Sequence, residues 1–276
     1  MKIICSILFF VWSVPFFAQQ EIRLYKILPG EEQKTGEKII CDAENNISYV
    51  SEAVNPRLLC YSPSEPCGTS VIICPGGGYQ RLNVGNARKI AEHLNNAGIT
   101  VFILIYRLPS PDKPLVAMEN LQMALETLSI NAAGLGLDKE KIGILGSSAG
   151  GHLAAMVATH HTCRPAFLIL TWPVISMREN IRHNGSFRQL LGENPTEEQL
   201  NYFSPDENVD TDTPPCFIVH GDKDPAVSVR NSLQFYQALT KHHIRSELHI
   251  YKQDRHGFGL DDPTGWISQL VNWMSE

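Results

Sequence analysis

The pentapeptide Gly146–Gly150, GSSAG, places the strongest constraint on how this chain can fold. It follows a strand-like apolar run, residues 141–145, and precedes a helix-like run, residues 152–158. A serine can stand on so sharp a strand-to-helix turn only where its neighbours carry no colliding side chains, which the two glycines provide. Such a turn holds the serine hydroxyl out of the sheet, with the backbone N–H of Ala149 beside it. We therefore predict that Ser148 is a nucleophile at the end of a buried strand.

Strand-like apolar runs alternate with helix-like patterns along the chain. The strand candidates are residues 22–28, 57–61, 70–74, 100–106, 141–145, 166–172, 215–220 and 246–251. Apolar residues at three- and four-residue spacing predict helices over residues 87–95, 116–130, 228–239 and 266–274. This alternation predicts an α/β fold with a mostly parallel central sheet and helices on both faces. Ligands bind such sheets at the carboxyl ends of the strands, where Ser148 falls.

The first residues differ from the rest. Lys2 is followed by an apolar run, residues 3–17, and then by Ala18 and a polar segment. This pattern is typical of a secretory signal peptide, residues 1–18, and the run is short for a membrane span. We expect a secreted or periplasmic protein with no integral membrane span once the signal is removed. An uncleaved N-terminal anchor is the alternative.

The rest of the chain, residues 19–276, has the size and composition of a single α/β domain, with 43% hydrophobic residues over a total length of 276. Residues 175–213 interrupt the alternation with polar sequence and scattered Gly and Pro. They are predicted to form an excursion over the active-site edge, or a small cap.

Charge and cysteine content exclude several classes of partner. A net charge of −6 disfavours nucleic acid and anionic membrane, whereas a neutral polysaccharide or ester is compatible with it. No Cys or His pair has zinc-site spacing, so no metal is predicted. Cys60 and Cys67 flank a Pro-rich turn and are the cysteines most suited to a disulfide in an oxidising compartment.

Three glycines follow the strand candidate that ends at Cys74, in the sequence PGGGY, residues 75–79. Acyl transfer needs backbone N–H groups aimed at the developing oxyanion, and glycines let the backbone approach closely. We predict an oxyanion hole formed by Ala149 with Gly77 or Gly78. A simple glycine-rich turn is the alternative, and a phosphate loop is disfavoured because Gly-Lys-Ser/Thr is absent.

An acid and a base follow later strands. Asp222 and Asp224 both lie after the strand candidate 215–220, and Asp224, just before a Pro-containing turn, is the preferred acid. His256 follows the last strand candidate on a loop with Gly257. A histidine moves protons near neutral pH, and a buried carboxylate can orient it. The predicted catalytic residues are therefore Ser148, Asp224 and His256, in the chain order expected of α/β-hydrolases.

With these segments in place, the chain resembles secreted carbohydrate esterases of the α/β-hydrolase superfamily, and most closely the acetyl xylan esterase and feruloyl esterase-like group. The matching segments are residues 75–79, 106–109, 142–154, 213–215, the acid loop through 231–233, and 256–259. The resemblance implies the same three catalytic residues and an acetyl, or less often feruloyl, ester on a polysaccharide or oligosaccharide. It implies no cofactor. Two positions depart from the pattern: Ser147 replaces an aromatic residue, and residues 83–86 lack acidic side chains.

The sequence-based hypothesis is a secreted serine esterase that acts on ester-substituted plant polysaccharides such as xylan. Tyr79, Trp172 and Arg107 are candidate substrate-binding residues, with ordinary packing at strand ends as their alternative. A serine hydrolase of the same fold acting on another small ester or a peptide is the main competing hypothesis. A non-catalytic glycan-binding relative is disfavoured because all three catalytic positions are filled.

Overall fold

The computed structural model describes residues 20–24, 36–160, 163–258 and 264–275. The predicted signal peptide, residues 1–18, lies outside these ranges. The main sheet has strand order β1-β4-β7-β5-β8-β9-β10-β11. Its strands are β1 (Gln20–Arg23), β4 (Arg57–Tyr61), β5 (Ser70–Cys74), β7 (Thr100–Ile105), β8 (Ile142–Ser147), β9 (Leu168–Thr171), β10 (Cys216–Gly221) and β11 (Ser246–Tyr251).

The main sheet is parallel from β7 to β11 and antiparallel where β4 joins β7 and β1 joins β4. Every residue of β5 and β7 is buried, as expected for strands covered on both faces. Each strand candidate has a counterpart here. The first candidate, 22–28, starts within β1 and runs into residues outside the described ranges.

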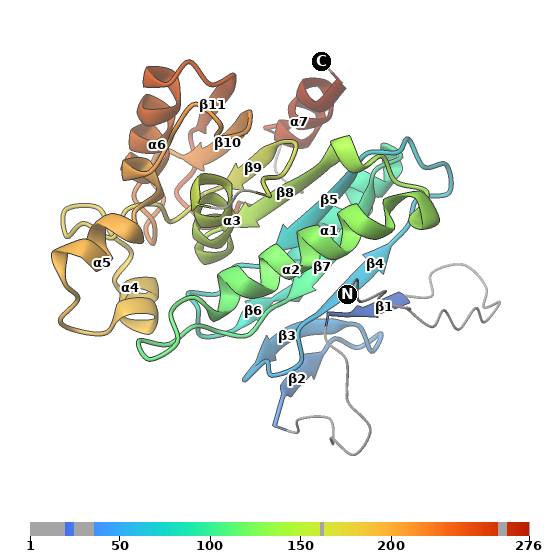
Figure 1. The fold of residues 1–276 in the computed structure, drawn as a ribbon, viewed down its shortest axis with the longest axis horizontal. Helices are drawn as coiled ribbons and strands as arrows, with labels where there is room; N and C mark the ends of the chain where they lie inside the picture. The colour runs from blue at the N-terminus through green and yellow to red at the C-terminus, as the bar shows by residue number, and fades with distance from the viewer. Residues whose placement is uncertain (1–19, 25–35, 161–162, 259–263, 276) are drawn as a thin grey trace, which may run out of the picture.

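Helices pack around this sheet (Figure 1). Helix α1 packs on β7, α3 on β8 and β9, α6 on β10 and β11, and α7 on β10. Their bounds are α1 (Val84–Asn96), α2 (Val116–Asn131), α3 (Ala149–His160), α6 (Arg230–Lys241) and α7 (Trp266–Ser275). The short 3₁₀ helices are η1 (Ala132–Leu135), η2 (Lys139–Lys141) and η3 (Pro205–Glu207). The mostly parallel, helix-covered sheet predicted from the alternation is confirmed.

A second, three-stranded sheet was not predicted. It pairs β2 (Lys38–Cys41), β3 (Ile47–Ser51) and β6 (Leu82–Asn83) in antiparallel order. The sheet matters for the site because β6 leads directly into α1, so the chain that leaves the glycine-rich loop is fixed by pairing with β3.

The predicted excursion carries two helices of its own, α4 (Asn184–Leu191) and α5 (Glu197–Tyr202). Both helices begin at a capped residue. His183 accepts a hydrogen bond from Ser186 N–H at the start of α4, and Thr196 forms a capping box with Gln199 at the start of α5. The segment is therefore ordered structure that leaves the sheet after β9 and returns to it at β10.

The pair most suited to a disulfide, Cys60 and Cys67, does not form one here, because both are free thiols. Cys60 lies in β4 with its sulfur 3.5 Å from Ser62 Oγ, and the Cys67 amide bonds to Gly98. Cys74 and Cys216 are buried thiols in β5 and β10, as expected from their apolar surroundings.

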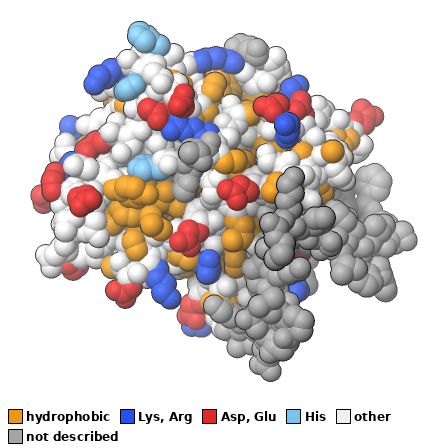
Figure 2. Space-filling view, viewed as in Figure 1, with side chains coloured by type: hydrophobic (Ala, Val, Ile, Leu, Met, Phe, Trp, Pro, Cys, Tyr) orange, Lys and Arg blue, Asp and Glu red, His pale blue; other side chains and the backbone are white. Residues whose placement is uncertain are grey.

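The surface carries both signs of charge. Acidic and basic side chains are scattered among one another on the face shown in Figure 2, which is the face that carries α2. Within the described ranges, no helix is both long enough and apolar enough to cross a bilayer.

Candidate active site

Four loops meet at the carboxyl edge of the main sheet, because parallel strands end on the same side. The glycine-rich loop follows β5, the serine turn follows β8, and the loops with Asp224 and His256 follow β10 and β11. The excursion with α4 and α5 leaves from the end of β9, at the same edge. The topology thus gathers segments that are far apart in the sequence.

Ser148 stands on the turn between β8 and α3 with φ of +55°. A left-handed conformation is costly for a residue with a side chain and persists only where the surroundings enforce it. Here Ser148 N donates to Thr171 O at 3.0 Å, and Ser148 O accepts from Gly151 N at 2.9 Å and Val174 N at 3.0 Å. Backbone hydrogen bonds on both sides therefore fix the strained turn.

The glycines around Ser148 leave no room for a side chain. A Cβ at Gly146 would lie 2.3 Å from the carbonyl oxygen of Gly150, and a Cβ at Gly150 would lie 2.1 Å from that of Cys74. At Gly76, across the turn, it would lie 2.7 Å from Ser147 O. The glycine pattern thus reflects three backbone segments packed directly on one another.

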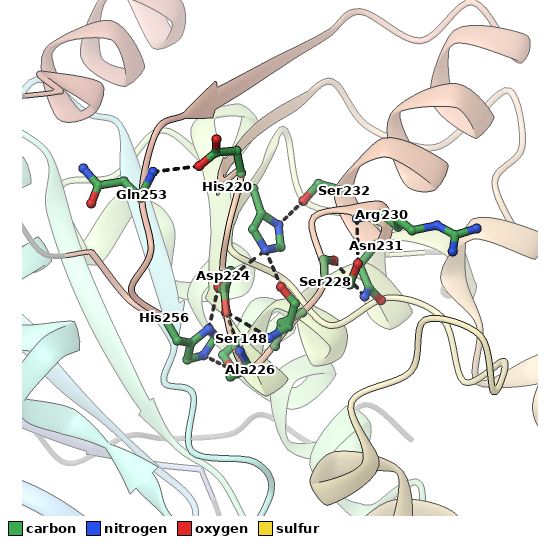
Figure 3. A network of polar contacts seen from close by, with 12 residues as sticks. Ser148, His220, Asp224, Ala226, Ser228, Arg230, Asn231, Ser232, Gln253 and His256 are labelled. Atoms are coloured by element: carbon green, nitrogen blue, oxygen red, sulfur yellow. Dashed lines mark hydrogen bonds and ion pairs between the residues drawn. The ribbon is translucent and has the colours of Figure 1, made fainter.

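Ser148, His256 and Asp224 form a continuous chain of hydrogen bonds (Figure 3). The distance from His256 Nε2 to Ser148 Oγ is 2.9 Å, and that from His256 Nδ1 to Asp224 Oδ2 is 2.7 Å. The Nδ1–H donates to the carboxylate, so Nε2 is left to accept from the serine hydroxyl. This is the arrangement in which an imidazole can remove a proton from serine.

The Asp224 carboxylate is wholly shielded from solvent. Its second oxygen, Oδ1, accepts from Ala226 N and Val227 N, both at 2.9 Å. Burial alone would raise the pKa of this carboxyl, but hydrogen bonds from His220, His256 and Val227 outweigh it and hold the pKa well below its usual range. The group is therefore anionic when it faces His256.

Asp222, the other acid considered from sequence, does not contact His256 in this arrangement. It is exposed, and its Oδ1 accepts from Gln253 N at 2.9 Å. This bond ties the loop after β10 to the loop after β11. The structure thus brings Asp224 to the histidine and leaves Asp222 to join the two loops.

A second histidine lies beside the Asp224 carboxylate, and no role was predicted for it from the sequence. His220, fully buried at the end of β10, places Nε2 2.9 Å from Val227 O and 3.5 Å from Asp224 Oδ2. Its Nδ1 lies 2.7 Å from Ser232 Oγ (Figure 3). Because a carbonyl can only accept, the proton is on Nε2 and the Ser232 hydroxyl donates to Nδ1. The signal that could have revealed it is a polar residue inside a buried apolar strand.

The glycine-rich loop turns sharply beside the serine. Gly77 and Gly78 have φ of +137° and +65°, and a Cβ at Gly77 would lie 2.0 Å from Arg81 O. Both glycines and Ser148 line one cleft. Ala149 is the first residue of α3, so its amide has no partner within the helix and is available to an oxyanion. The geometry keeps both Gly77 and Gly78 open as the other donor.

The cleft has a volume of about 440 Å³. It is lined by Pro75, Gly76, Gly77, Gly78, Gln80, Arg81, Asn83, Asn86, Ala87, Ser147, Ser148, Trp172, His183, Gly185, Ala226, His256 and Gly257. Of the substrate-binding candidates, Trp172 lines the cleft, where it packs against Phe258 with ring centroids 4.9 Å apart.

The prediction that Tyr79 and Arg107 bind substrate is not supported, because neither is among the described residues that line the cleft. The Tyr79 ring is 3% exposed and turned inward, with its hydroxyl 2.8 Å from His152 Nδ1. Arg107 donates through its backbone N and its Nε to Asn120 Oδ1, at 3.0 and 3.2 Å. In both cases a hydrogen bond to a buried partner holds the side chain away from the cleft, although the residue lies at a strand end.

His152 fixes the inside of the loop. Its Nε2 lies 2.8 Å from Phe203 O, so the proton is on Nε2 and the Tyr79 hydroxyl donates to Nδ1. Burial lowers the pKa of His152 to about 4. The glycine-rich loop, α3 and the excursion are thereby joined through one uncharged imidazole.

Part of the cleft wall was not predicted from the sequence. Gln80, Arg81, Asn83 and Asn86 come from the chain around β6, and His183 comes from the excursion. Among the described residues, no group of three His, Cys, Asp or Glu side chains could hold a metal ion. The arrangement offers an activated hydroxyl, a base with its acid, and backbone donors, which together suit acyl transfer.

The chain matches two protein families and several curated proteins. The model of the prolyl oligopeptidase family matches residues 124–276, and the family described as BD-FAE matches residues 58–166. The chain is 30% identical over 236 residues to an acetylxylan esterase of Xylanibacter ruminicola, covering 82% of this chain and 49% of that protein. It is 29% identical over 276 residues to endo-1,4-beta-xylanase B of Butyrivibrio fibrisolvens, covering 92% of this chain and 43% of the relative. The chain thus spans about half the length or less of these curated relatives.

Among solved structures, the chain is similar to an acetyl ester-xyloside bifunctional hydrolase from Caldicellulosiruptor lactoaceticus. The TM-score is 0.77 at 31% identity, over 93% of this chain and 96% of the other. The fold alone is also shared with the carboxylesterase Cest-2923 from Lactobacillus plantarum, with a TM-score of 0.70 at 20% identity over 88% of this chain and 97% of the other. The expected α/β-hydrolase fold is confirmed.

Proposed function

Because the chain belongs to the prolyl oligopeptidase family of α/β-hydrolases, we propose that it is a serine carboxylic ester hydrolase that removes acetyl groups from plant polysaccharides such as xylan. The observation that carries the proposal is the hydrogen-bonded series Ser148–His256–Asp224, of which Ser148 and His256 line an open cleft. The names of the relatives support the acetyl-ester substrate class.

In the proposed mechanism, Ser148 Oγ attacks the carbonyl carbon of the ester while its proton passes to His256 Nε2. Asp224 stabilises the resulting imidazolium. The amides of Ala149 and of Gly77 or Gly78 stabilise the negative carbonyl oxygen. His256 then donates its proton to the departing sugar oxygen, leaving an acetyl group on Ser148. Water, activated by His256, releases acetate by the reverse path.

The test is acetate release from acetylated xylan by the full chain, alongside hydrolysis of 4-nitrophenyl acetate, with Ser148→Ala as control. We expect activity on both substrates, and a loss in kcat of roughly 10⁶-fold in Ser148→Ala. Serine-dependent cleavage of the small ester alone would keep the chemistry but reject xylan. Near-normal activity of Ser148→Ala would place the nucleophile elsewhere.

Peptide hydrolysis is the second candidate, favoured by the family match over residues 124–276. A prolyl 4-nitroanilide peptide in the same assay separates the two candidates, because only a peptidase would release nitroaniline from it.

Feruloyl ester cleavage is tested in the same way with methyl ferulate. Secretion through residues 1–18 is part of the proposal, and N-terminal sequencing of the exported protein tests it.

A further inference from the structure

The side chain of His183 enters the cleft from the excursion between β9 and β10. It precedes α4 and is half-buried. Its Cε1 would lie 3.8 Å from a Cβ at Gly78, so the ring stands beside the glycine-rich loop. Gly185 makes room for the ring, because a Cβ there would lie 3.0 Å from Cε1. The local sequence is thus adapted to hold an imidazole against the open cleft.

The hydrogen bonds of His183 fix its tautomer. Nδ1 accepts from Ser186 N at 3.1 Å, and Ser186 Oγ lies 2.9 Å from the same nitrogen. The backbone N–H of Ser186 can only donate, so the Nδ1 that accepts from it carries no proton. The ring proton is therefore on Nε2, the nitrogen farther from the helix.

The charge state of the ring suits a donor beside a working base. Burial lowers the pKa of His183, and the nearby His256 lowers it further, while Asp224 acts in the opposite direction. The imidazole therefore stays uncharged near neutral pH and does not repel His256 when that residue takes up a proton. Within the described ranges, no protein group forms a hydrogen bond with Nε2 of His183, so its N–H is a donor without a protein acceptor.

We propose that His183 is a specificity-determining residue whose Nε2–H donates a hydrogen bond to a hydroxyl of the sugar that carries the ester. This inference rests on the proposed function and adds to it a subsite for the leaving group. An acetyl group fills only a small part of a 440 Å³ cleft, so the alcohol portion must occupy the rest. His183 belongs to that part because it lines the same cleft as His256 and lies within electrostatic reach of it. His256 is the residue that must reach the leaving oxygen.

Two substitutions separate the two functions of the ring. In His183→Asn, the amide oxygen takes the place of Nδ1 and can still cap α4, but the Nε2 donor is lost. In His183→Gln, an amide N–H reaches the position of Nε2, but the cap on the Ser186 amide is lost. His93→Asn is the matched control, since it makes the same change at an exposed histidine in the last turn of α1.

The readout is the ratio of kcat/KM for an acetylated xylo-oligosaccharide to kcat/KM for 4-nitrophenyl acetate, whose leaving group has no sugar hydroxyl. We expect His183→Asn to lower this ratio roughly three- to tenfold, as for one neutral hydrogen bond. His183→Gln should keep most of the ratio while its melting temperature falls, and His93→Asn should match the parent protein. An equal loss on both substrates, an unchanged ratio in His183→Asn, or the same loss in His183→Gln would overturn the proposal.

A second measurement does not depend on glycan hydrolysis. Unesterified xylo-oligosaccharide should inhibit 4-nitrophenyl acetate hydrolysis competitively, and His183→Asn should raise its inhibition constant roughly three- to tenfold. Absence of inhibition in the parent protein, or an unchanged constant in the variant, would reject the subsite. Failure of the proposed function appears differently, as no acetate release from xylan while the inhibition constant still shifts.

Discussion

The two halves of the candidate active site are built in opposite ways. On the nucleophile side, Ser148 is fixed because three backbone segments touch where Gly76, Gly146 and Gly150 have no side chains. On the acid–base side, Asp224 and His256 lie on loops and are fixed by hydrogen bonds to side chains and amides. The nucleophile side depends on the absence of side chains at the glycines, and the acid–base side depends on the presence of hydrogen-bond partners.

This difference explains what each half tolerates. Close-packed backbone cannot adjust to an added methyl group without moving, so the nucleophile side should respond to changes in size. Hydrogen-bonded loops instead lose their arrangement when a donor or acceptor is removed. Substitutions that change size without polarity, or polarity without size, should therefore separate the two halves.

The largest expected effect on the polar half comes from Asp224→Asn, which keeps the size of the side chain and removes its charge. The amide would favour the wrong tautomer of His256, and kcat should fall roughly 10⁴-fold. The matched control is Asp222→Asn, whose amide oxygen can still accept from Gln253 N and which should change kcat less than about threefold. Equal effects of the two substitutions would show that Asp224 does not act through His256.

On the steric half, Gly150→Ala adds one methyl group where a Cβ would lie 2.1 Å from Cys74 O. We expect the free energy of unfolding to fall by about 3 kcal/mol and kcat to fall roughly 10²-fold, because the turn must shift. Gly134→Ala is the control, since a Cβ there meets nothing within 4 Å. Denaturant unfolding and steady-state kinetics measure both effects. A fully active, stable Gly150→Ala would mean that the turn is not confined as described.

The buried His152 predicts a pH dependence of stability on the nucleophile side. Because its pKa is lowered to about 4, the unfolded chain takes up a proton on this residue at a higher pH than the folded protein does. Its contribution is complete above about pH 6.5 and is lost as the pH falls toward 4, by about 2 kcal/mol between pH 7 and pH 5. Urea unfolding of the parent protein and of His152→Gln should therefore converge at low pH, and parallel curves would contradict the assignment.

The smallest effect is expected for His220→Gln on the acid–base side. The amide can still donate toward Val227 O and Asp224, but it loses the rigid ring that also accepts from Ser232. We expect kcat to fall roughly tenfold with little change in KM, since His220 only positions Asp224. Ser232→Ala should produce part of the same loss. An effect confined to KM would place His220 in substrate binding instead.

The sequence predicts the steric half better than the polar half, for a physical reason. A glycine pattern between a strand and a helix is a local signal, and the runs at residues 141–145 and 152–158 were sufficient to place Ser148 on its turn. The choice between Asp222 and Asp224 depends on which part of the loop after β10 meets His256, a tertiary contact that sequence order does not contain. The position of Asp224 before a proline indicated the residue that the structure brings to His256.

Most of the wrong or missing predictions concern contacts that the local sequence does not reveal. Tyr79 and Arg107 lie at strand ends and were expected in the pocket, but each found a buried hydrogen-bond partner, His152 or Asn120. His183 was missed because residues 175–213 have no periodic pattern to place them. The sheet of β2, β3 and β6 was missed because its strands are short and partly exposed. Tertiary contacts decided the positions of Tyr79, Arg107 and the second sheet, whereas His183 was missed for lack of a local pattern.

The glycine packing around Ser148 also bears on how such a protein can diverge. At Gly76, Gly146 and Gly150, any other residue would bring a Cβ within 2.7 Å of a backbone oxygen, so these codons have almost no neutral substitutions. His183 and Gly185 lie on the excursion, outside the three backbone segments that pack around Ser148. Under the role proposed for His183, a lineage built on this scaffold would exchange its preferred sugar by drift in the excursion while its reaction stays the same.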